Sequence, residues 1–166
     1  MSHHTSSKFE GRAISKPSFV IRLAISSERA ELEALQWRAS LSNPGDREAL
    51  LAHPDAIHLP VEQIDSGDVF VAELDGVAVG FAALRPRADQ ETELDALFVE
   101  PRMQRRGIGR LLLEHCISVA HERKFCVLEV IANPHAKEFY AVCGFILIGT
   151  SQTQFGSALL MRRSLV

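Results

Sequence analysis

A short loop rich in glycine and arginine carries the clearest chemistry in the sequence. It reads Gln104-Arg105-Arg106-Gly107-Ile108-Gly109, and Arg110 follows it in a strongly periodic segment. The N-terminus of a helix presents free N–H groups and the positive end of the helix dipole, so it attracts phosphate. Glycines let the backbone approach an anion closely, and arginines add charge-assisted hydrogen bonds. The loop therefore indicates a site for a phosphate-bearing ligand; the simpler interpretation is a helix-start turn with solvated arginines.

This sequence does not match two well-known phosphate-binding motifs. A Walker A loop needs Lys and then Ser or Thr after its last glycine, but Gly109 is followed by Arg110-Leu111. A dinucleotide-binding fingerprint would put its third small residue at Leu112, and its acidic ribose partner is missing. The loop therefore belongs to another class.

Thiols and imidazoles are weaker candidates. Cys116 and Cys143 have no His and carboxylate in a recognisable catalytic arrangement, so buried thiols are the better interpretation. His53 and His58 lie in a segment without a strong period and are weak candidates for substrate contact. We expect no metal site: His3 and His4 are better interpreted as part of a solvated tail than as metal ligands, because no Cys or carboxylate stands at ligand spacing from them.

The elements that position the loop are readable from their patterns. Val69–Leu74 and Val77–Leu84 flank Asp75-Gly76, which predicts a hairpin, because a type I′ turn needs φ > 0 at both central residues. Thr92–Val99 is the strand before the loop. Its alternation predicts Leu94, Ala96 and Phe98 on one face, and Glu93, Asp95, Leu97 and Val99 on the other.

A helix is expected to start near Gly107. Its apolar stripe comprises Ile108, Leu111, Leu112, His115, Cys116 and Val119. Arg110 and Glu114 stand four apart on the outer face, where they can pair. Further strands are expected at 19–25, 125–131, 145–150 and 158–164, and further helices at 26–40, 47–53 and 134–142.

Composition limits the classes of protein. The 166 residues, 46% hydrophobic and 23% charged, fit one globular domain at 19–166 after a polar, flexible arm at 1–18. A net charge of −3 argues against non-specific nucleic-acid binding. No apolar run approaches the ~18 residues of a membrane helix, so no membrane partner is expected. Three widely spaced cysteines without a CxxC pair favour reduced thiols in the cytoplasm.

Two segments together resemble a known family. Val99-Glu100-Pro101 followed by Gln104–Gly109 resembles the pyrophosphate motif of the GNAT superfamily of N-acetyltransferases, V-x-P-x-x-(Q/R)-x-x-G-x-G/A, with Met103 as one extra residue relative to the most compact members. Asn133–Phe145 is similar to the family's N-x-x-A-x-x-F-Y-x-x-x-G-F segment. The close match covers about Val69–Phe145, and the expected strand order extends it to Phe19–Arg163.

The resemblance implies an α/β (α+β) fold. It has a mixed, mostly antiparallel seven-stranded sheet, helices on both faces, and a splay between the fourth and fifth strands. Acetyl-coenzyme A, without a metal, is expected to lie in that splay. Its pantetheine arm would pair with the fourth strand as an added strand does. The residues implied in cofactor binding are Leu97, Phe98, Val99, Gln104, Arg105, Arg106, Gly107, Ile108, Gly109, Arg110, Asn133, Phe139 and Tyr140.

The family's reaction is direct attack of a primary amine, of a small molecule or a peptide, on the acetyl thioester. Tyr140, the only tyrosine, occupies the position of the acid that protonates the leaving thiolate; the alternative is a packing aromatic. Glu93, rather than Asp95, is expected to help deprotonate the amine, because it stands six residues before Val99, like the base of the histone-acetylating branch. The alternatives are a Glu93 paired with an arginine and no dedicated base.

Two other functions compete with a catalytic acetyltransferase. A non-catalytic acyl-CoA-binding or sensing module could use the same fold, but it would not need Tyr140. A toxin that acetylates aminoacyl-tRNA is disfavoured by the charge of −3. The acceptor depends on residues 19–67 and on Ser151–Gly156, where motifs are absent. The oligomeric state, a homodimer included, stays open.

Overall fold

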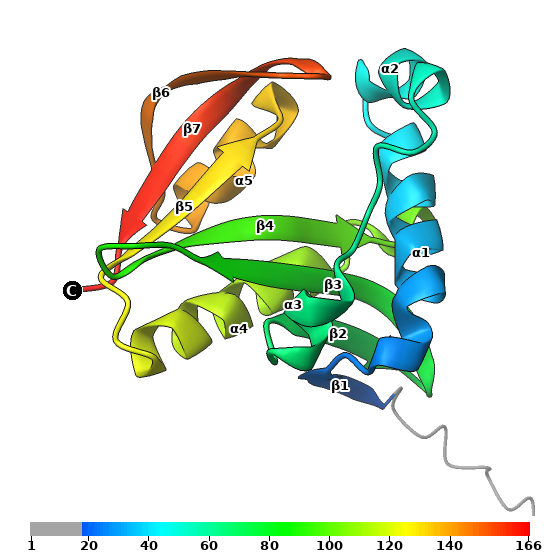
Figure 1. Ribbon diagram of the computed structural model, residues 1–166, viewed down its shortest axis with the longest axis horizontal. Helices are drawn as coiled ribbons and strands as arrows, with labels where there is room; N and C mark the ends of the chain where they lie inside the picture. The colour runs from blue at the N-terminus through cyan, green and yellow to red at the C-terminus, as the bar shows by residue number, and fades with distance from the viewer. Residues whose placement is uncertain (1–17) are drawn as a thin grey trace, which may run out of the picture.

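The computed structural model describes residues 18–166, and every strand and helix predicted above is present in it. The predicted arm at 1–18 lies outside the described residues except for Ser18. One seven-stranded sheet has the order β1-β2-β3-β4-β5-β7-β6 (Figure 1). Its strands are β1 (Phe19–Leu23), β2 (Val69–Leu74), β3 (Val77–Pro86), β4 (Glu91–Val99), β5 (Val127–Ala132), β6 (Ile146–Thr153) and β7 (Gly156–Ser164).

All neighbouring strands are antiparallel except β4 and β5, which are parallel, so the predicted fold class is confirmed. The helices are α1 (Arg29–Leu41), α2 (Asp46–Ala52), α3 (Val61–Asp65), α4 (Ile108–Glu122) and α5 (Lys137–Val142). Single 3-10 turns at Ser26–Glu28, Pro101–Met103 and Pro134–Ala136 lead into α1, the glycine loop and α5. None of the helices within 18–166 is long and apolar enough to span a membrane.

Two apolar clusters fix the helices on opposite faces of the sheet. Buried residues of α4 and α5 join one cluster, and buried residues of α1 and α3 join the other. The buried face of α4 consists of Ile108, Leu112, Leu113, Cys116 and Ala120. Leu111, predicted in the stripe, is exposed, so that part of the prediction is wrong. The stripe is rotated towards Leu113 because α4 packs on both β3 and β4.

The predicted hairpin between β2 and β3 is confirmed. Asp75 and Gly76 have φ of 49° and 82°, the left-handed values that a type I′ turn requires. The backbone of Ser18 pairs with Asp75, which ties the start of β1 to this turn.

The predicted alternation in β4 is wrong at its centre. In the β3–β4 pairing, Ala83 faces Ala96 while Leu84 faces Leu94, so Asp95 is an inserted residue, a β-bulge. Leu94 consequently packs in the α4-side cluster, together with Leu97 and Val99. Ala96 and Phe98 pack on the opposite side, against the cluster of α1 and α3.

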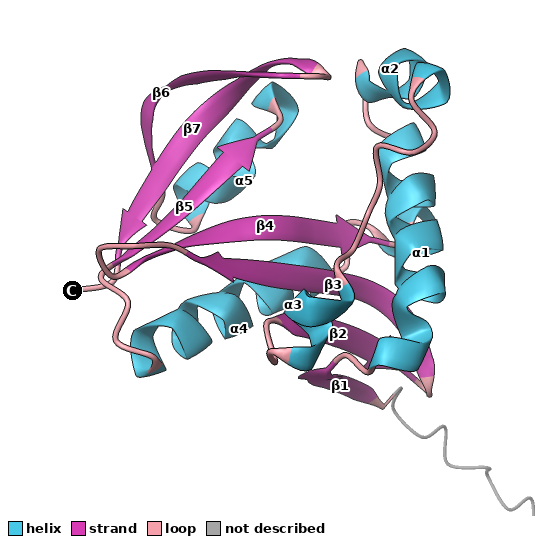
Figure 2. Cartoon of the chain, viewed as in Figure 1, coloured by secondary structure: helices cyan, strands magenta, loops and turns pink. Residues whose placement is uncertain are grey.

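The sheet divides beyond the bulge. Parallel pairing joins Glu91–Leu94 of β4 to Val127–Val130 of β5 and stops there. The strands β5, β7 and β6 then diverge from β4 as a separate leaf, and α2 lies across from that leaf (Figure 2). The splay between the fourth and fifth strands is therefore present, and Asp95 stands at its fork.

Candidate active site

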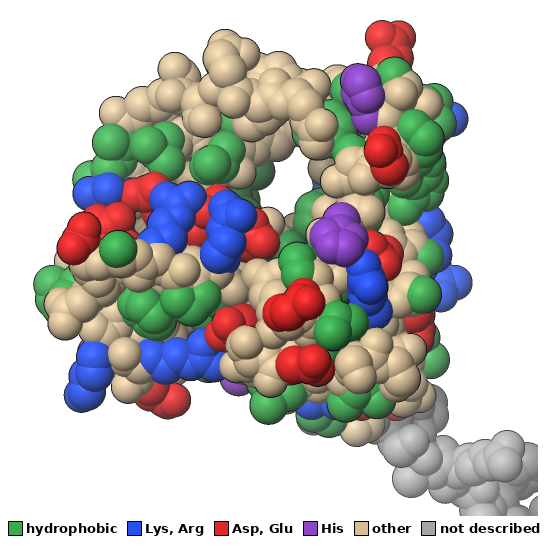
Figure 3. Space-filling view, in the orientation of Figure 1, with side chains coloured by type: hydrophobic (Ala, Val, Ile, Leu, Met, Phe, Trp, Pro, Cys, Tyr) green, Lys and Arg blue, Asp and Glu red, His purple; other side chains and the backbone are tan. Residues whose placement is uncertain are grey.

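A cavity of about 1070 Å³ opens between the two leaves of the sheet. Figure 3 shows the molecule hollowed there, between the β6–β7 leaf and the α1–α2 segment. The cavity brings together most of the residues that the sequence proposed for a cofactor. Those that line it are Leu97, Phe98, Val99, Gln104, Arg105, Gly107, Ile108, Gly109, Arg110, Asn133, Phe139 and Tyr140. Arg106 and Glu93, also proposed as site residues, are outside the lining.

The glycine loop ends on the exposed N-terminus of α4. Gly107 precedes the helix with φ of 80°, a left-handed value that favours glycine. The amides of Ile108–Arg110 have no acceptor earlier in the helix, whereas Leu111 N–H donates to the carbonyl of Gly107 at 3.0 Å. Free amides and the helix dipole lie here beside Arg105 and Arg110, which line the cavity; Nε of Arg110 also donates to Glu114 at 3.0 Å. The local chemistry fits an anion.

Gly109 brings the ends of three elements into contact. A Cβ placed on it would lie 3.7 Å from Cγ2 of Val99 and 3.8 Å from Cζ of Phe139. The first turn of α4 therefore packs closely on the end of β4 and on α5. This contact joins both segments that carry the family resemblance in one wall of the cavity.

Tyr140 lies on the wall formed by α5 and is almost completely buried. Its ring packs edge-on against Phe139 and Phe145, with centroids 5.0 and 5.4 Å apart. Burial raises the pKa of the phenol well above its usual range. The side chain is thus both a packing aromatic and a phenol that stays protonated at neutral pH.

Asn133 begins the 3-10 turn before α5, as an N-cap. Its Oδ1 accepts from the N–H of His135 at 2.9 Å, and Pro134 occupies the first position of the turn. Its Nδ2 donates to Oδ2 of Asp46 at 3.3 Å. Because Asp46 is the first residue of α2, this hydrogen bond crosses the splay.

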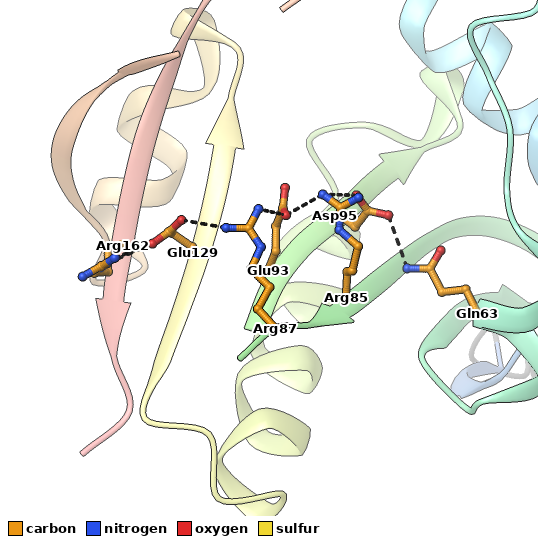
Figure 4. Close-up of polar contacts among 7 residues, drawn as sticks. All are labelled: Gln63, Arg85, Arg87, Glu93, Asp95, Glu129 and Arg162. Carbon is orange, nitrogen blue, oxygen red and sulfur yellow. Dashed lines mark hydrogen bonds and ion pairs between the residues drawn. The ribbon is translucent and has the colours of Figure 1, made fainter. Parts of the chain in front are cut away.

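Glu93 belongs to a network of ion pairs rather than to the cavity wall (Figure 4). Its buried carboxylate accepts hydrogen bonds from Arg85, at 2.6 Å, and from Arg87. Arg87 also reaches Glu129 at 3.2 Å, and Glu129 pairs with Arg162. The alternative in which Glu93 pairs with an arginine describes this arrangement. Asp95, by contrast, lines the cavity.

The structure settles the weaker candidates by burial and contact. Cys116 is fully buried, and burial raises the pKa of its thiol to about 12, so it is unsuited to nucleophilic attack. The ring of His115 stacks edge-on against Phe70, and burial lowers its pKa. His53 and His58 are outside the cavity lining. Within 18–166, no three His, Cys, Asp or Glu residues are grouped as metal ligands.

The sequence assigned the acceptor to residues 19–67 and Ser151–Gly156 but identified no individual residue of the cavity wall in these regions. Asn43–Asp46 and Ala56–Ile57 line it from the segment around α2, and Phe155 lines it from the β6–β7 turn. These segments have neither a strong hydrophobic period nor a motif. Their contribution follows from the way the chain folds across the splay, which no local signal reveals.

A family model, Acetyltransferase (GNAT) family, matches residues 30–145 of the chain. The chain is 41% identical over 59 residues to a peptidyl-lysine N-acetyltransferase of Escherichia coli, which is 36% of this chain and 39% of the relative. A protein of the same description from Salmonella typhimurium is 29% identical over 133 residues, 80% and 86% of the two chains. The first three relatives are matched over 39%, 58% and 40% of their length, less than two thirds in each case.

Solved structures share the fold. The PaiA N-acetyltransferase of Thermoplasma acidophilum, in complex with coenzyme A, superimposes with a TM-score of 0.72 at 18% identity, over 89% of this chain and 99% of the other. The yncA protein of Salmonella typhimurium, with its cofactor acetyl-CoA, gives a TM-score of 0.69 at 23% identity, over 90% and 95%. At these identities the likeness concerns the fold alone.

Proposed function

The chain belongs to the GNAT family of acetyltransferases, and we propose that it transfers the acetyl group of acetyl-coenzyme A to a primary amine of a small molecule or a peptide. The observation that carries this proposal is the shared cavity. The first residues of α4 and Tyr140 both line it, and this shared lining supports the proposal. In this proposal residues 19–166 act as a single catalytic domain.

The donor fits the chemistry of the cavity. The amides of Ile108–Arg110, with Gln104, Arg105 and Arg110, would hold the pyrophosphate. Beyond Leu94, no strand within 18–166 pairs with β4 on its β5 side, so the backbone groups of Leu97–Val99 would be available to the amides of the pantetheine arm. Asn133 and Phe139 would contact the same arm from the opposite wall, and Arg106 would meet the phosphates from outside the lining.

The reaction follows from this placement. The neutral amine attacks the thioester carbonyl, an N–C bond forms, and a backbone N–H of β4 stabilises the oxyanion. The C–S bond then breaks, and Tyr140 donates its proton to the departing sulfur. Its raised pKa keeps the phenol protonated until that charge develops. The proton lost by the amine nitrogen passes to water and restores the phenol.

Glu93 is one of two candidates in this proposal for the acceptor of the amine's proton; the other is solvent. Its carboxylate is bound to Arg85 and Arg87 and does not reach the cavity wall. It would therefore accept the amine's proton only through water. The alternative is that the amine loses its proton to solvent before it binds.

A thiol-release assay tests the proposal. Acetyl-CoA is offered with a panel of alkylamines, amino acids and lysine peptides, the last because two relatives are named peptidyl-lysine N-acetyltransferases. Amine-dependent release of thiol, with the acetylated amine found by mass spectrometry, is the expected result. Binding of acetyl-CoA without release for any amine would overturn the enzyme assignment in favour of a binding or sensing module.

A further inference from the structure

Asp95 lies where the β-bulge of β4 and the end of the β4–β5 pairing meet. It is the inserted residue of the β3–β4 bulge, and it directly follows Leu94, the last residue of β4 that pairs with β5. The bulge and the end of parallel pairing thus coincide at one residue. Asp95 lines the cavity at the fork, where the two leaves separate.

The carboxylate of Asp95 accepts a hydrogen bond from Gln63 and lies farther from its neighbouring arginine, Arg85. Nε2 of Gln63 donates to the carbonyl of Leu84 at 2.9 Å and to Oδ2 of Asp95 at 3.3 Å. Arg85 lies 3.6 Å from Oδ1, but the same guanidinium lies only 2.6 Å from Glu93. Among the described residues, the arginine beside Asp95 is therefore paired more closely with Glu93 than with Asp95.

The surrounding network has an excess of negative charge. Among the described residues it contains three arginines and four carboxylates, in a row across β3, β4, β5 and β7 (Figure 3). Figure 4 shows all of them except Glu91. Its inner carboxylates, Glu93 and Glu129, are buried and closely paired. Its two ends, Asp95 and Glu91, are 30% and 31% exposed and lie 3.6 and 3.7 Å from an arginine. Only Asp95 of these four lines the cavity.

The cavity is consequently polarised along β4. Arg105 and Arg110 line it at the glycine loop, and Asp95 lines it at the fork, about 13 Å from Val99 along the strand. The other titratable groups of the lining are Asp46, already bonded to Asn133, and His135, Tyr140 and Cys143. Nε of Arg110 also donates to Glu114 at 3.0 Å. An anionic donor is favoured at the loop and a cation at the fork.

We propose that Asp95 anchors the acceptor by receiving its ammonium group. The acceptor is then a primary alkylammonium without a carboxylate beside the amine, as in a lysine side chain, because such a carboxylate would face Asp95. This inference rests on the proposed acetyltransferase function. Since the anchored ammonium must still lose a proton before it attacks, the anchor acts on binding, and its removal changes KM more than kcat.

The test compares Asp95→Asn with Glu91→Gln. Glu91 is a matched control because it is equally exposed and equally loosely paired in the same network but does not line the cavity. Each protein is assayed with Nα-acetyl-lysine amide and with norleucine, whose only amine lies beside a carboxylate. We expect the parent to prefer the lysine amide, and Asp95→Asn to raise KM for it about tenfold, the loss of one charge-assisted hydrogen bond. Glu91→Gln should leave both acceptors unchanged, and acetyl-CoA affinity should stay constant throughout.

Two results would overturn the anchor while leaving the acetyltransferase intact. One is an unchanged KM in Asp95→Asn with transfer still measurable. The other is a preference of the parent for norleucine that is absent from Arg85→Met. That result would mean that the arginines bind the carboxylate of the acceptor. A parent that acetylates no amine in the wider panel refutes the proposed function itself. If the melting temperature of Asp95→Asn is lower than that of Glu91→Gln, the comparison is repeated with Asp95→Ser.

Discussion

Arg38 and Glu100 form a two-pronged ion pair between α1 and the entrance to the glycine loop. Nε and Nη2 of Arg38 donate to the two carboxylate oxygens of Glu100, each at 2.8 Å. The backbone N–H of Glu100 donates to the carbonyl of Val79 at 2.8 Å, and its side chain is only 11% exposed. The pair thereby ties a helix of the cavity wall to the residue at which β4 passes into the loop.

Replacing Arg38 with Met should weaken both the fold and the binding of acetyl-CoA. The substitution leaves the carboxylate of Glu100 unpaired next to the loop proposed to hold the pyrophosphate. We expect a loss of about 1 kcal/mol in unfolding free energy, because Arg38 is half exposed, and a smaller thermal shift with acetyl-CoA. Arg22→Met is the control, since Arg22 makes the same kind of pair with Glu28 away from the cavity. Equal thermal shifts in the two variants would disprove a link to the loop.

The same pair makes stability depend on pH. Arg38 lowers the pKa of Glu100 below its usual range. A carboxyl whose pKa is lower in the folded state contributes stability at neutral pH and loses it as pH falls through the folded value. The difference in unfolding free energy between the parent and Arg38→Met should therefore be full at pH 7 and shrink below about pH 4. Urea unfolding at pH 7, 5 and 3.5 measures this, and a constant difference would contradict it.

Local chemistry explains which features were predictable from the sequence. The hairpin at Asp75-Gly76 and the helix start at Gly107 depend on φ values that few residues adopt, so their letters predict them. The faces of β4 were predicted wrongly because the bulge at Asp95 is set by the register with β3. The particular arginines that pair with Glu93 could not be predicted for a similar reason: Arg85 and Arg87 come from the end of β3 and the residue after it, and only the register with β4 places them beside Glu93.

Gly109→Ala should separate folding from cofactor binding. The added Cβ would make ordinary contacts with Val99 and Phe139, and alanine is favoured over glycine within a helix by about 1 kcal/mol. The variant should thus melt no lower than the parent but show a smaller thermal shift with acetyl-CoA, because the methyl group narrows the approach to the amides. Gly109→Val should abolish the shift. Ser118→Ala, at an exposed position of α4, is the control. If the Gly109 variants fold and show the same thermal shift with acetyl-CoA as Ser118→Ala, the loop is not the phosphate site.

Tyr140→Phe should reduce turnover by about 10²–10⁴-fold, the usual contribution of a general acid. The ring and its contacts with Phe139 and Phe145 remain, so melting temperature and the shift with acetyl-CoA should change little. Because burial raises the pKa of the phenol, kcat of the parent should not decline through Tyr140 ionisation below about pH 10. Near-normal turnover in the variant, with chemistry rate-limiting, would leave Tyr140 as a packing residue.

Glu93 and Asp95 are predicted to differ in how they affect the pH dependence of kcat/KM. If Glu93 takes the amine's proton through water, it must be ionised, and Glu93→Gln should lose the acidic limb of the profile. Asp95→Asn should retain that limb and show a raised acceptor KM at every pH, as expected of an anchor.

Because Glu93 neutralises Arg85 and Arg87, its replacement also disturbs the network, so Arg87→Met is measured beside it. Loss of the limb in both Glu93→Gln and Arg87→Met would assign the effect to the network as a whole. Identical profiles in Glu93→Gln and the parent would mean that solvent deprotonates the amine before it binds.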